Sequence, residues 1–161
     1  MNNEIIIEVN EVFKKYDDAT VLDNVSLEIE KGKIYGLVGR NGSGKTVLMK
    51  CICGLIKPTS GEVKVAGKTV GKDVDIPEDI GVIIETPGFI PNYSGFKNLK
   101  LLASVRNKIS NEEIRKSMEI VGLEPKSRKH VGKYSLGMRQ KLGIAQAIME
   151  KPKILILDEP M

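Results

Sequence analysis

The stretch GRNGSGKT, residues 39–46, constrains the fold of this chain more than any other part of its sequence. It matches the pattern G-x-x-x-x-G-K-[ST] at every required position. The apolar segment KIYGLV (33–38) precedes it, and a second apolar segment, TVLMKCICG (46–54), follows it. Because such loops join a buried strand to a helix, we predict a strand over 33–38 and a helix after the loop. A glycine turn that contains Lys-Thr by chance would not need both flanking elements.

The residue types of this loop suit a bound phosphate. Three glycines let the backbone curl so that successive N–H groups point at an anion, and the following helix adds its positive end. Lys45 can reach the β- and γ-phosphates of a nucleotide, and Thr46 can offer its hydroxyl to Mg²⁺. The candidate nucleotide-binding residues of the loop are Gly39, Arg40, Asn41, Gly42, Ser43, Gly44, Lys45, Thr46 and Val47.

Two acids follow a second apolar run near the other end of the chain, in ILILDEP (154–160). Asp158 stands at the end of a predicted buried strand and suits a magnesium ligand. Glu159 adds a carboxylate that could polarise an attacking water as a general base. A lone Asp-Glu pair after an apolar run is weak evidence, but a phosphate loop in the same chain strengthens it.

Composition narrows the class of protein. The 161 residues fit one ordinary domain, with 41% hydrophobic and 29% charged residues, as in soluble globular proteins. No apolar run reaches the roughly 18–20 residues that span a bilayer, and the N-terminal sequence lacks the pattern of a signal peptide. We therefore expect a cytoplasmic chain. The net charge of +4 is scattered and aromatics are only 4%, so nucleic-acid binding is not expected.

The apolar pattern predicts strands early and helices late. Strands are expected at 25–30, 33–38, 79–84 and 154–157, with a hairpin over 61–70 around Gly67-Lys68. Helices are expected at 94–108, 110–122 and 137–150, the second opened by a Ser110–Glu113 capping box. The first helix should bury Phe96, Leu99, Leu102 and Val105 on one face. Cys51 and Cys53, two residues apart on the helix after the loop, are expected to be buried hydrophobic residues.

A resemblance becomes specific at YSLGMRQKLGIAQAIMEKPKILILDEP (134–160), which is similar to the ATP-binding subunit of an ABC transporter. That family carries a signature of the form L-S-G-G-Q ahead of its acidic strand. Here the signature residues are Ser135, Leu136, Gly137 and Met138, after Tyr134, so the serine and the second glycine are kept. The first glycine and the glutamine are replaced. Ser135 is also placed to cap a helix whose N-terminus would face phosphate.

Three further segments carry the same resemblance. Tyr16, in FKKYDDATVLDNVSL, resembles the aromatic residue that stacks on adenine, although an ordinary strand-end tyrosine is the alternative. PTSGEVKVAGK (58–68) resembles the family's antiparallel hairpin. Glu85 stands where the family usually has a glutamine that contacts magnesium and the attacking water. The segments around Glu85 and Ser135 together resemble the branch that exports bacitracin- or lantibiotic-type peptides.

The resemblance implies a P-loop NTPase fold of ABC type, within a single domain covering residues 1–161. It would comprise an antiparallel β subdomain and a helical subdomain at about 88–150. The family's second carboxylate-flanked loop and its switch histidine would follow the acidic strand, so the C-terminal part is expected to be missing. The one histidine, His130, precedes the signature and is expected to lie on the surface.

The same resemblance implies a function, with ATP and Mg²⁺ as cofactors. Two ATP-binding subunits would form a head-to-tail dimer, in which each signature faces the other subunit's phosphate loop. The dimer would power a transmembrane permease from the inner face of the cell membrane. Thr46, Asp158 and Glu85 would hold magnesium, and Glu159 would be the catalytic base. The alternatives are a chain that only binds nucleotide, and a soluble ABC-type ATPase outside transport. The latter typically carries two cassettes or a coiled-coil insertion, which this sequence does not show.

Overall fold

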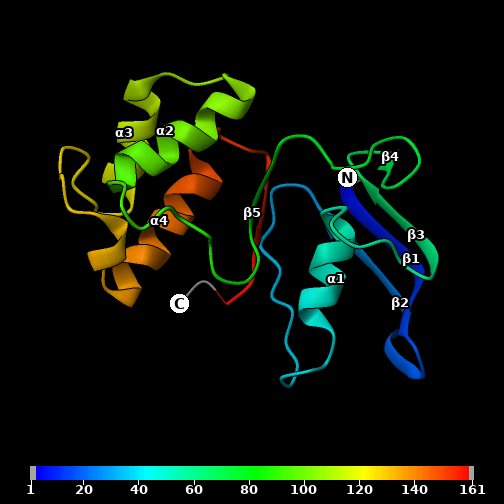
Figure 1. Cartoon of the computed structure of the whole chain (residues 1–161). Coiled ribbons are helices and arrows are strands. Elements are labelled where there is room, and N and C mark those ends of the chain that lie inside the picture. Colours follow the sequence, from blue (N-terminus) through cyan, green and yellow to red (C-terminus); the bar gives the residue numbers. More distant parts are fainter. Residues whose placement is uncertain (1–2, 160–161) are drawn as a thin grey trace. The chain divides into compact units, whose positions relative to one another are not determined.

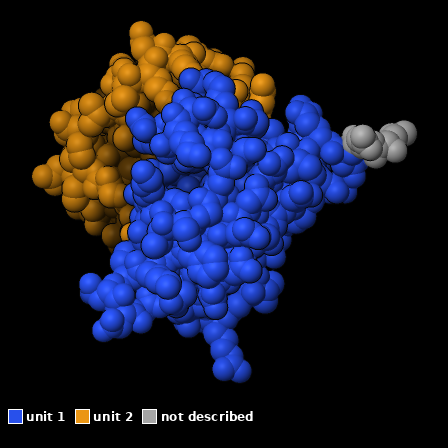
Figure 2. All heavy atoms as spheres, turned by 90° about the vertical axis from the view of Figure 1, so that its right-hand side faces the viewer, with its two compact units in different colours: residues 1–78 blue, residues 79–161 orange. Residues whose placement is uncertain are grey.

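The computed structural model describes residues 3–159. The chain divides into two compact units, residues 1–78 and residues 79–161, coloured separately in Figure 2. Each unit has its own core of apolar side chains and its own sheet. Within residues 3–159, no helix combines the length and the apolar character needed to cross a bilayer.

The first unit is built on an antiparallel sheet. Its strands are β1 (Ile5–Tyr16), β2 (Ala19–Glu30), β3 (Ser60–Val65) and β4 (Lys68–Thr69), in the order β2-β1-β3-β4 (Figure 1). The predicted strand at 25–30 is the second half of β2, and Val25 and Leu27 are more covered than Ser26 and Glu28, as alternation requires. The predicted hairpin over 61–70 is also confirmed. Its turn lies at Ala66 and Gly67, which both have positive φ, one residue earlier than the predicted Gly67-Lys68 turn.

Helix α1 (Lys45–Ile52) packs against β2 and β3 of this sheet. Its buried side chains are Leu48, Cys51 and Ile52, and Cys53 follows as a buried C-cap. The prediction of buried cysteines is therefore confirmed. Burial raises the pKa of both thiols, that of Cys53 to about 11, so both stay protonated at neutral pH.

The predicted central strand at 33–38 is wrong. Neither sheet of the described residues includes this segment, and Ile34 and Val38 are 101% and 99% exposed. Its apolar character gave the expectation of burial, but a strand forms only where a neighbour supplies hydrogen bonds to its backbone. Tyr35 makes one contact back to β2, where its hydroxyl accepts the Glu30 backbone N–H at 3.2 Å.

The second unit contains a parallel strand pair and a cluster of three helices. Strands β5 (Ile80–Ile83) and β6 (Ile154–Leu157) pair in register, Ile80 opposite Ile154. The helices are α2 (Gly95–Arg106), α3 (Asn111–Ile120) and α4 (Leu136–Ile148), with a 3₁₀ turn η1 (Val131–Lys133) before α4 (Figure 1). The two strands and the three α-helices were predicted from the sequence, with boundaries that differ by a few residues, whereas η1 was not. Helix α4 in particular begins one residue earlier than predicted.

The helical cluster buries one side of each helix, but α2 does so differently from the prediction. Leu99 is fully buried and Phe96 packs at the edge of the core, whereas Leu102 is exposed and Val105 is 82% exposed. Ala103 takes the inner position instead. The buried residues of the cluster are Leu99, Ala103, Ile114, Met118, Leu123, Val131, Tyr134, Leu142, Ala145 and Met149. The predicted apolar face is therefore only half correct.

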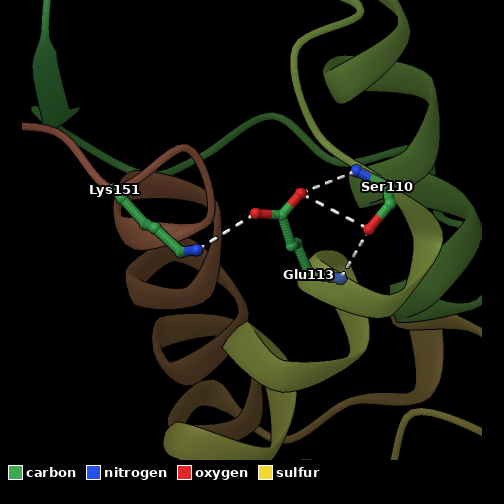
Figure 3. A network of polar contacts seen from close by, with 3 residues as sticks. All are labelled: Ser110, Glu113 and Lys151. Atoms are coloured by element: carbon green, nitrogen blue, oxygen red, sulfur yellow. Dashed lines mark hydrogen bonds and ion pairs between the residues drawn. The ribbon is translucent and has the colours of Figure 1, made fainter.

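The capping box at the start of α3 is present and reaches a second element (Figure 3). The Ser110 hydroxyl accepts the Glu113 backbone N–H at 3.3 Å, and the Glu113 carboxylate accepts the Ser110 backbone N–H at 2.9 Å. The other carboxylate oxygen accepts a hydrogen bond from Lys151 Nζ at 3.0 Å, after the end of α4. The Ser110 backbone N–H, and next the Lys151 ammonium, lower the pKa of Glu113 below its ordinary value of 4.5.

A lowered carboxyl pKa makes stability depend on pH. The stabilisation from Glu113 is present above the unfolded-state pKa near 4.5 and is lost as pH falls through the lower folded-state value. Glu113→Gln should therefore lower the thermal midpoint at pH 7, and the difference from the parent chain should vanish well below pH 4.5. Glu119→Gln, on the exposed side of the same helix, is the control and should leave the pH profile unchanged. Parallel profiles for the parent and Glu113→Gln over the whole pH range would contradict the assignment.

Candidate functional site

Residues 39–43 of the phosphate-loop motif form an exposed loop, Gly44 is buried, and Lys45 and Thr46 are the first two residues of α1. A turn closes the loop, with the Ser43 backbone N–H donating to the Arg40 carbonyl at 3.1 Å. The Lys45 ammonium folds back over the loop and donates to the carbonyls of Gly39 and Arg40 at 2.7 and 3.0 Å. It also lies 3.4 Å from the Ser43 hydroxyl. The lysine is thus held at the centre of its own loop, where a cation can meet phosphate oxygens.

Glycine is required where this loop meets the helix. Gly44 is the N-cap of α1 with φ +93°, and a Cβ there would lie 2.7 Å from the Val21 carbonyl oxygen. At the other end of the loop, a Cβ on Gly39 would lie 2.6 Å from the Ser43 hydroxyl. Among the described residues, no side chain caps the N-terminus of α1. Its first N–H groups therefore suit an anion, and the donors of this loop fit a phosphate group.

Glu85 and Asp158 follow two strands that are neighbours in the second unit. The Asp158 backbone N–H donates to the Ile83 carbonyl at 2.8 Å, which continues the β5–β6 ladder by one bond. Because the strands are parallel, their carboxyl ends meet at the same edge of the sheet, and both acids leave from that edge. Glu85 and Glu159 both have positive φ, +63° and +45°. Non-glycine residues in this region are often found at functional sites.

The signature residues lie at the start of α4. Ser135 is its N-cap, and the serine hydroxyl accepts the Met138 backbone N–H at 3.1 Å. This confirms the predicted cap. Leu136 is 68% exposed and Gly137 is also exposed, whereas Tyr134 just before them is buried in the helical core. The start of α4 therefore exposes Ser135, Leu136 and Gly137 beside the buried Tyr134.

Tyr16 lies at the end of β1, in the turn to β2, where it pairs with Ala19. Tyr16 is 44% exposed, and the Lys14 ammonium lies 4.9 Å from the centroid of its ring. An exposed ring of this kind has a surface on which another flat group could stack. The adenine contact remains a prediction.

Sequence reasoning missed Asn98, which organises the segment between Glu85 and α2. It is buried inside α2, and its side-chain oxygen accepts the Ile90 backbone N–H at 2.8 Å. Its amide nitrogen donates to the carbonyls of Ile90 and Ser94 at 3.1 and 3.0 Å. An asparagine in a helix interior is unfavourable unless its side chain has a task. The place of Asn98 inside the predicted helix 94–108 was the signal that could have identified it.

The candidate residues fall into two groups. Tyr16 and residues 39–47 belong to the first unit, and Glu85, Asp158, Glu159 and residues 135–138 belong to the second. Within each unit the structure gathers the predicted residues at element ends: the start of α1, the paired ends of β5 and β6, and the start of α4. These are the places where backbone N–H groups and strand-end carboxylates serve nucleotide chemistry.

Comparison with known proteins identifies the family. The family described as ABC transporter matches residues 22–161, which include the phosphate loop, the signature and both acids. The chain belongs to the ABC transporter family. It carries that family's ATP-binding domain, as the resemblance at residues 134–160 predicted.

Curated relatives in this family include bacitracin and lantibiotic transport ATP-binding proteins. The chain is 49% identical over 155 residues to the uncharacterized ABC transporter ATP-binding protein YybJ of Bacillus subtilis, covering 96% of the chain and 71% of that protein. It is 46% identical over 159 residues to the bacitracin transport ATP-binding protein BcrA of Enterococcus faecalis, covering 98% and 52%. A lantibiotic transport ATP-binding protein of Streptococcus pyogenes is 38% identical. The chain thus spans about half the length of some of these relatives.

A solved structure shows the same fold. The ATP-binding cassette MJ0796, described as a dimer in a post-hydrolysis state bound to ADP and Pi, superposes with a TM-score of 0.84. The match covers 97% of this chain and 75% of that chain at 24% identity. This confirms the predicted α/β fold of ABC type.

The geometry of the loop predicts unequal effects for two glycine substitutions. Gly42→Ala meets no atom within 4 Å, so it should cost only the strain of positive φ, about 1–2 kcal/mol. Gly44→Ala adds a clash with the Val21 backbone and should lose about 1–3 kcal/mol more. Urea unfolding of the two variants and the parent measures the difference. Equal losses would show that the loop does not pack on β2 as described.

Proposed function

We propose that this chain binds and hydrolyses ATP as part of the ATP-binding subunit of a transporter. The observation that carries this proposal is the phosphate loop, with Lys45 at its centre and the uncapped start of α1 beside it. A chain of this family with such a loop has the hydrogen-bond donors that bind the phosphates of a nucleoside triphosphate. The two acids at the end of β6 supply the groups for hydrolysis.

The loop would bind the phosphates through exchange of hydrogen bonds. Lys45 would turn from the carbonyls of Gly39 and Arg40 to the β- and γ-phosphate oxygens. The N–H groups of residues 42–47 and the positive end of α1 would hold the remaining oxygens. Tyr16 would stack on the adenine, which places the base near the β1–β2 turn.

Thr46, Asp158 and Glu85 would hold Mg²⁺. A hydroxyl and carboxylates are ligands that this ion accepts, and it commonly takes only one or two carboxylates beside substrate phosphates. When bound, the ion would neutralise negative charge on the phosphates. Glu159, adjacent to Asp158, would accept a proton from the attacking water as general base. Glu85, in place of an uncharged glutamine, would bring one more negative charge to this edge of the sheet.

The signature at the start of α4 would act on the nucleotide of a second ATP-binding subunit. Residues 135–138 present the capped helix N-terminus outward, which suits a γ-phosphate supplied by another chain. Two subunits would then assemble head to tail around two nucleotides. The solved structure with the same fold is a dimer of cassettes, which supports this arrangement.

The membrane partner would be a permease that the subunit drives from the cytoplasmic face. Residues from Glu85 to about Val105 would dock on its cytoplasmic helices. Exposed apolar side chains on this segment, at Ile90, Leu101 and Val105, support that placement. The names of the bacitracin and lantibiotic transport relatives support export of antimicrobial peptides as the task of the whole transporter.

Removing the loop lysine tests nucleotide binding. Lys45→Ala should weaken Mg-ATP binding by about 10- to 150-fold, because it removes a charge-assisted contact worth about 1.5–3 kcal/mol. Lys68→Ala, which removes an exposed charge on β4, is the matched control and should bind as the parent does. Binding is measured with a fluorescent ATP analogue and by calorimetry. Unchanged affinity in Lys45→Ala would refute the assignment of the loop.

A second variant separates hydrolysis from binding. Glu159→Gln should retain Mg-ATP affinity and lose about 10²- to 10⁴-fold in turnover, the usual contribution of a general base. Phosphate release under saturating ATP measures turnover. If the parent chain binds Mg-ATP without turnover, it acts by nucleotide binding alone. Equal turnover in the parent and Glu159→Gln would assign the base to another residue.

A further inference from the structure

An open hollow lies in the second unit between the start of α2 and the loop that leads to η1. Its volume is about 400 Å³. One wall is formed by residues 92–97, including the first turn of α2, and the other by residues 125–130. None of the residues assigned above to nucleotide, metal or signature lines it. The wall at residues 92–97 belongs to the segment proposed above to dock on the permease, whereas residues 125–130 lie outside that segment.

The lining is cationic. Lys97, Lys126 and Arg128 line the hollow together with His130, and no aspartate or glutamate lines it. Among residues 3–159, none of the ion pairs involves Lys97, Lys126 or Arg128. The nearest acid in sequence, Glu124, uses its carboxylate to accept the Lys126 backbone N–H at 3.0 Å, not the ammonium. The positive end of the 12-residue helix α2 adds to the same field.

The two walls are fixed to each other before any ligand arrives. Ser94 and His130 form an antiparallel bridge, and the Val131 backbone N–H donates to the Tyr93 carbonyl at 2.9 Å. Asn98 holds the Ile90–Ser94 segment through its buried amide. The Lys97 ammonium lies 3.8 Å from the centroid of the Tyr93 ring, so this cation is held at the rim. A ligand would therefore meet walls whose backbone is already fixed.

We propose that this hollow binds a phosphate-bearing anion at a site separate from the nucleotide. Arginine and lysine beside a helix N-terminus are a donor set that favours phosphate. The volume is that of a small-ligand pocket and suits a phosphate with a small organic group. Two sources share this chemistry: the headgroup of an anionic phospholipid and a free phosphate compound.

The single histidine of the chain makes the site directly observable. His130 lines the hollow, so its imidazole ¹H–¹³C resonance is an unambiguous reporter in the whole chain. Inorganic phosphate and glycerol 3-phosphate are titrated at constant pH, with sodium chloride keeping ionic strength constant. The His130 resonance should shift saturably with both compounds. A linear drift, or no shift, would overturn the proposal.

Matched variants assign the shift to this hollow. Lys126→Gln with Arg128→Gln should weaken the response about 10-fold or more, because two charged donors are lost. Lys108→Gln with Lys116→Gln removes the same charge from exposed positions elsewhere on the unit and should respond as the parent does. If the first pair lowers the far-ultraviolet circular dichroism signal, Arg128→Gln alone replaces it. An unchanged response in the hollow variants would overturn the proposal.

A further control separates this site from the phosphate loop. Lys45→Ala should leave the His130 shift intact, since no residue of the phosphate loop lines the hollow. Loss of the shift in Lys45→Ala would show that the response comes from the loop, and this proposal would fail while the proposed nucleotide site stood.

Vesicles distinguish the two sources. Co-sedimentation with phosphatidylcholine vesicles is compared with and without phosphatidylglycerol. Binding that needs phosphatidylglycerol and is lost in the Lys126, Arg128 pair of variants identifies the headgroup as ligand. A saturable His130 shift without vesicle binding identifies a free phosphate compound. Absence of both signals refutes the site.

Discussion

The parallel pairing of β5 with β6 is the contact on which the second unit depends. These strands are separated by 70 residues of chain, and their register closes that whole segment into a loop with three helices inside it. The pairing costs the closure entropy of a long loop, which the helical core around Leu99, Ile114 and Leu142 offsets. It also brings Glu85 and Asp158 to one edge of the sheet. The strand-end chemistry thus follows from the same hydrogen bonds that close the unit.

Local signals made most of this structure predictable from the sequence. The Ser110–Glu113 box, the Ser135 cap and the alternation in 25–30 each act within a few residues, so their pattern is visible in the sequence. The apolar run 33–38 also predicted a strand, and that prediction was wrong. A strand needs a neighbouring strand to pair with, and the apolar character of a segment does not specify one. The predicted burial of Val105 was wrong for a related reason, since a helix face is buried only where another element covers it.

In the candidate site, too, local features were predicted and features that depend on distant segments were not. The phosphate loop, the signature and the acids were found by motif, because each motif encodes its own local geometry. The contacts of Asn98 and the hollow beside His130 were not found. The contacts of Asn98 reach back only four to eight residues, but they require the fold of the Ile90–Ser94 segment. The hollow depends on the bridge between Ser94 and His130, which joins segments 36 residues apart. The basic run at residues 126–130 was visible in the sequence, but only the opposite wall makes it a site.

The two anion sites would select their ligands by different physical means. Lys45 already donates to two carbonyls of its loop, so a ligand there must replace hydrogen bonds that the loop makes for itself. Binding then replaces the hydrogen bonds of Lys45 to these carbonyls, which favours a ligand whose several phosphate oxygens can accept new hydrogen bonds in their place. The cations of the hollow face no carboxylate in its lining, so even one phosphate gains attraction without displacing an ion pair. A polyphosphate chain therefore suits the loop, and a single phosphate group suits the hollow.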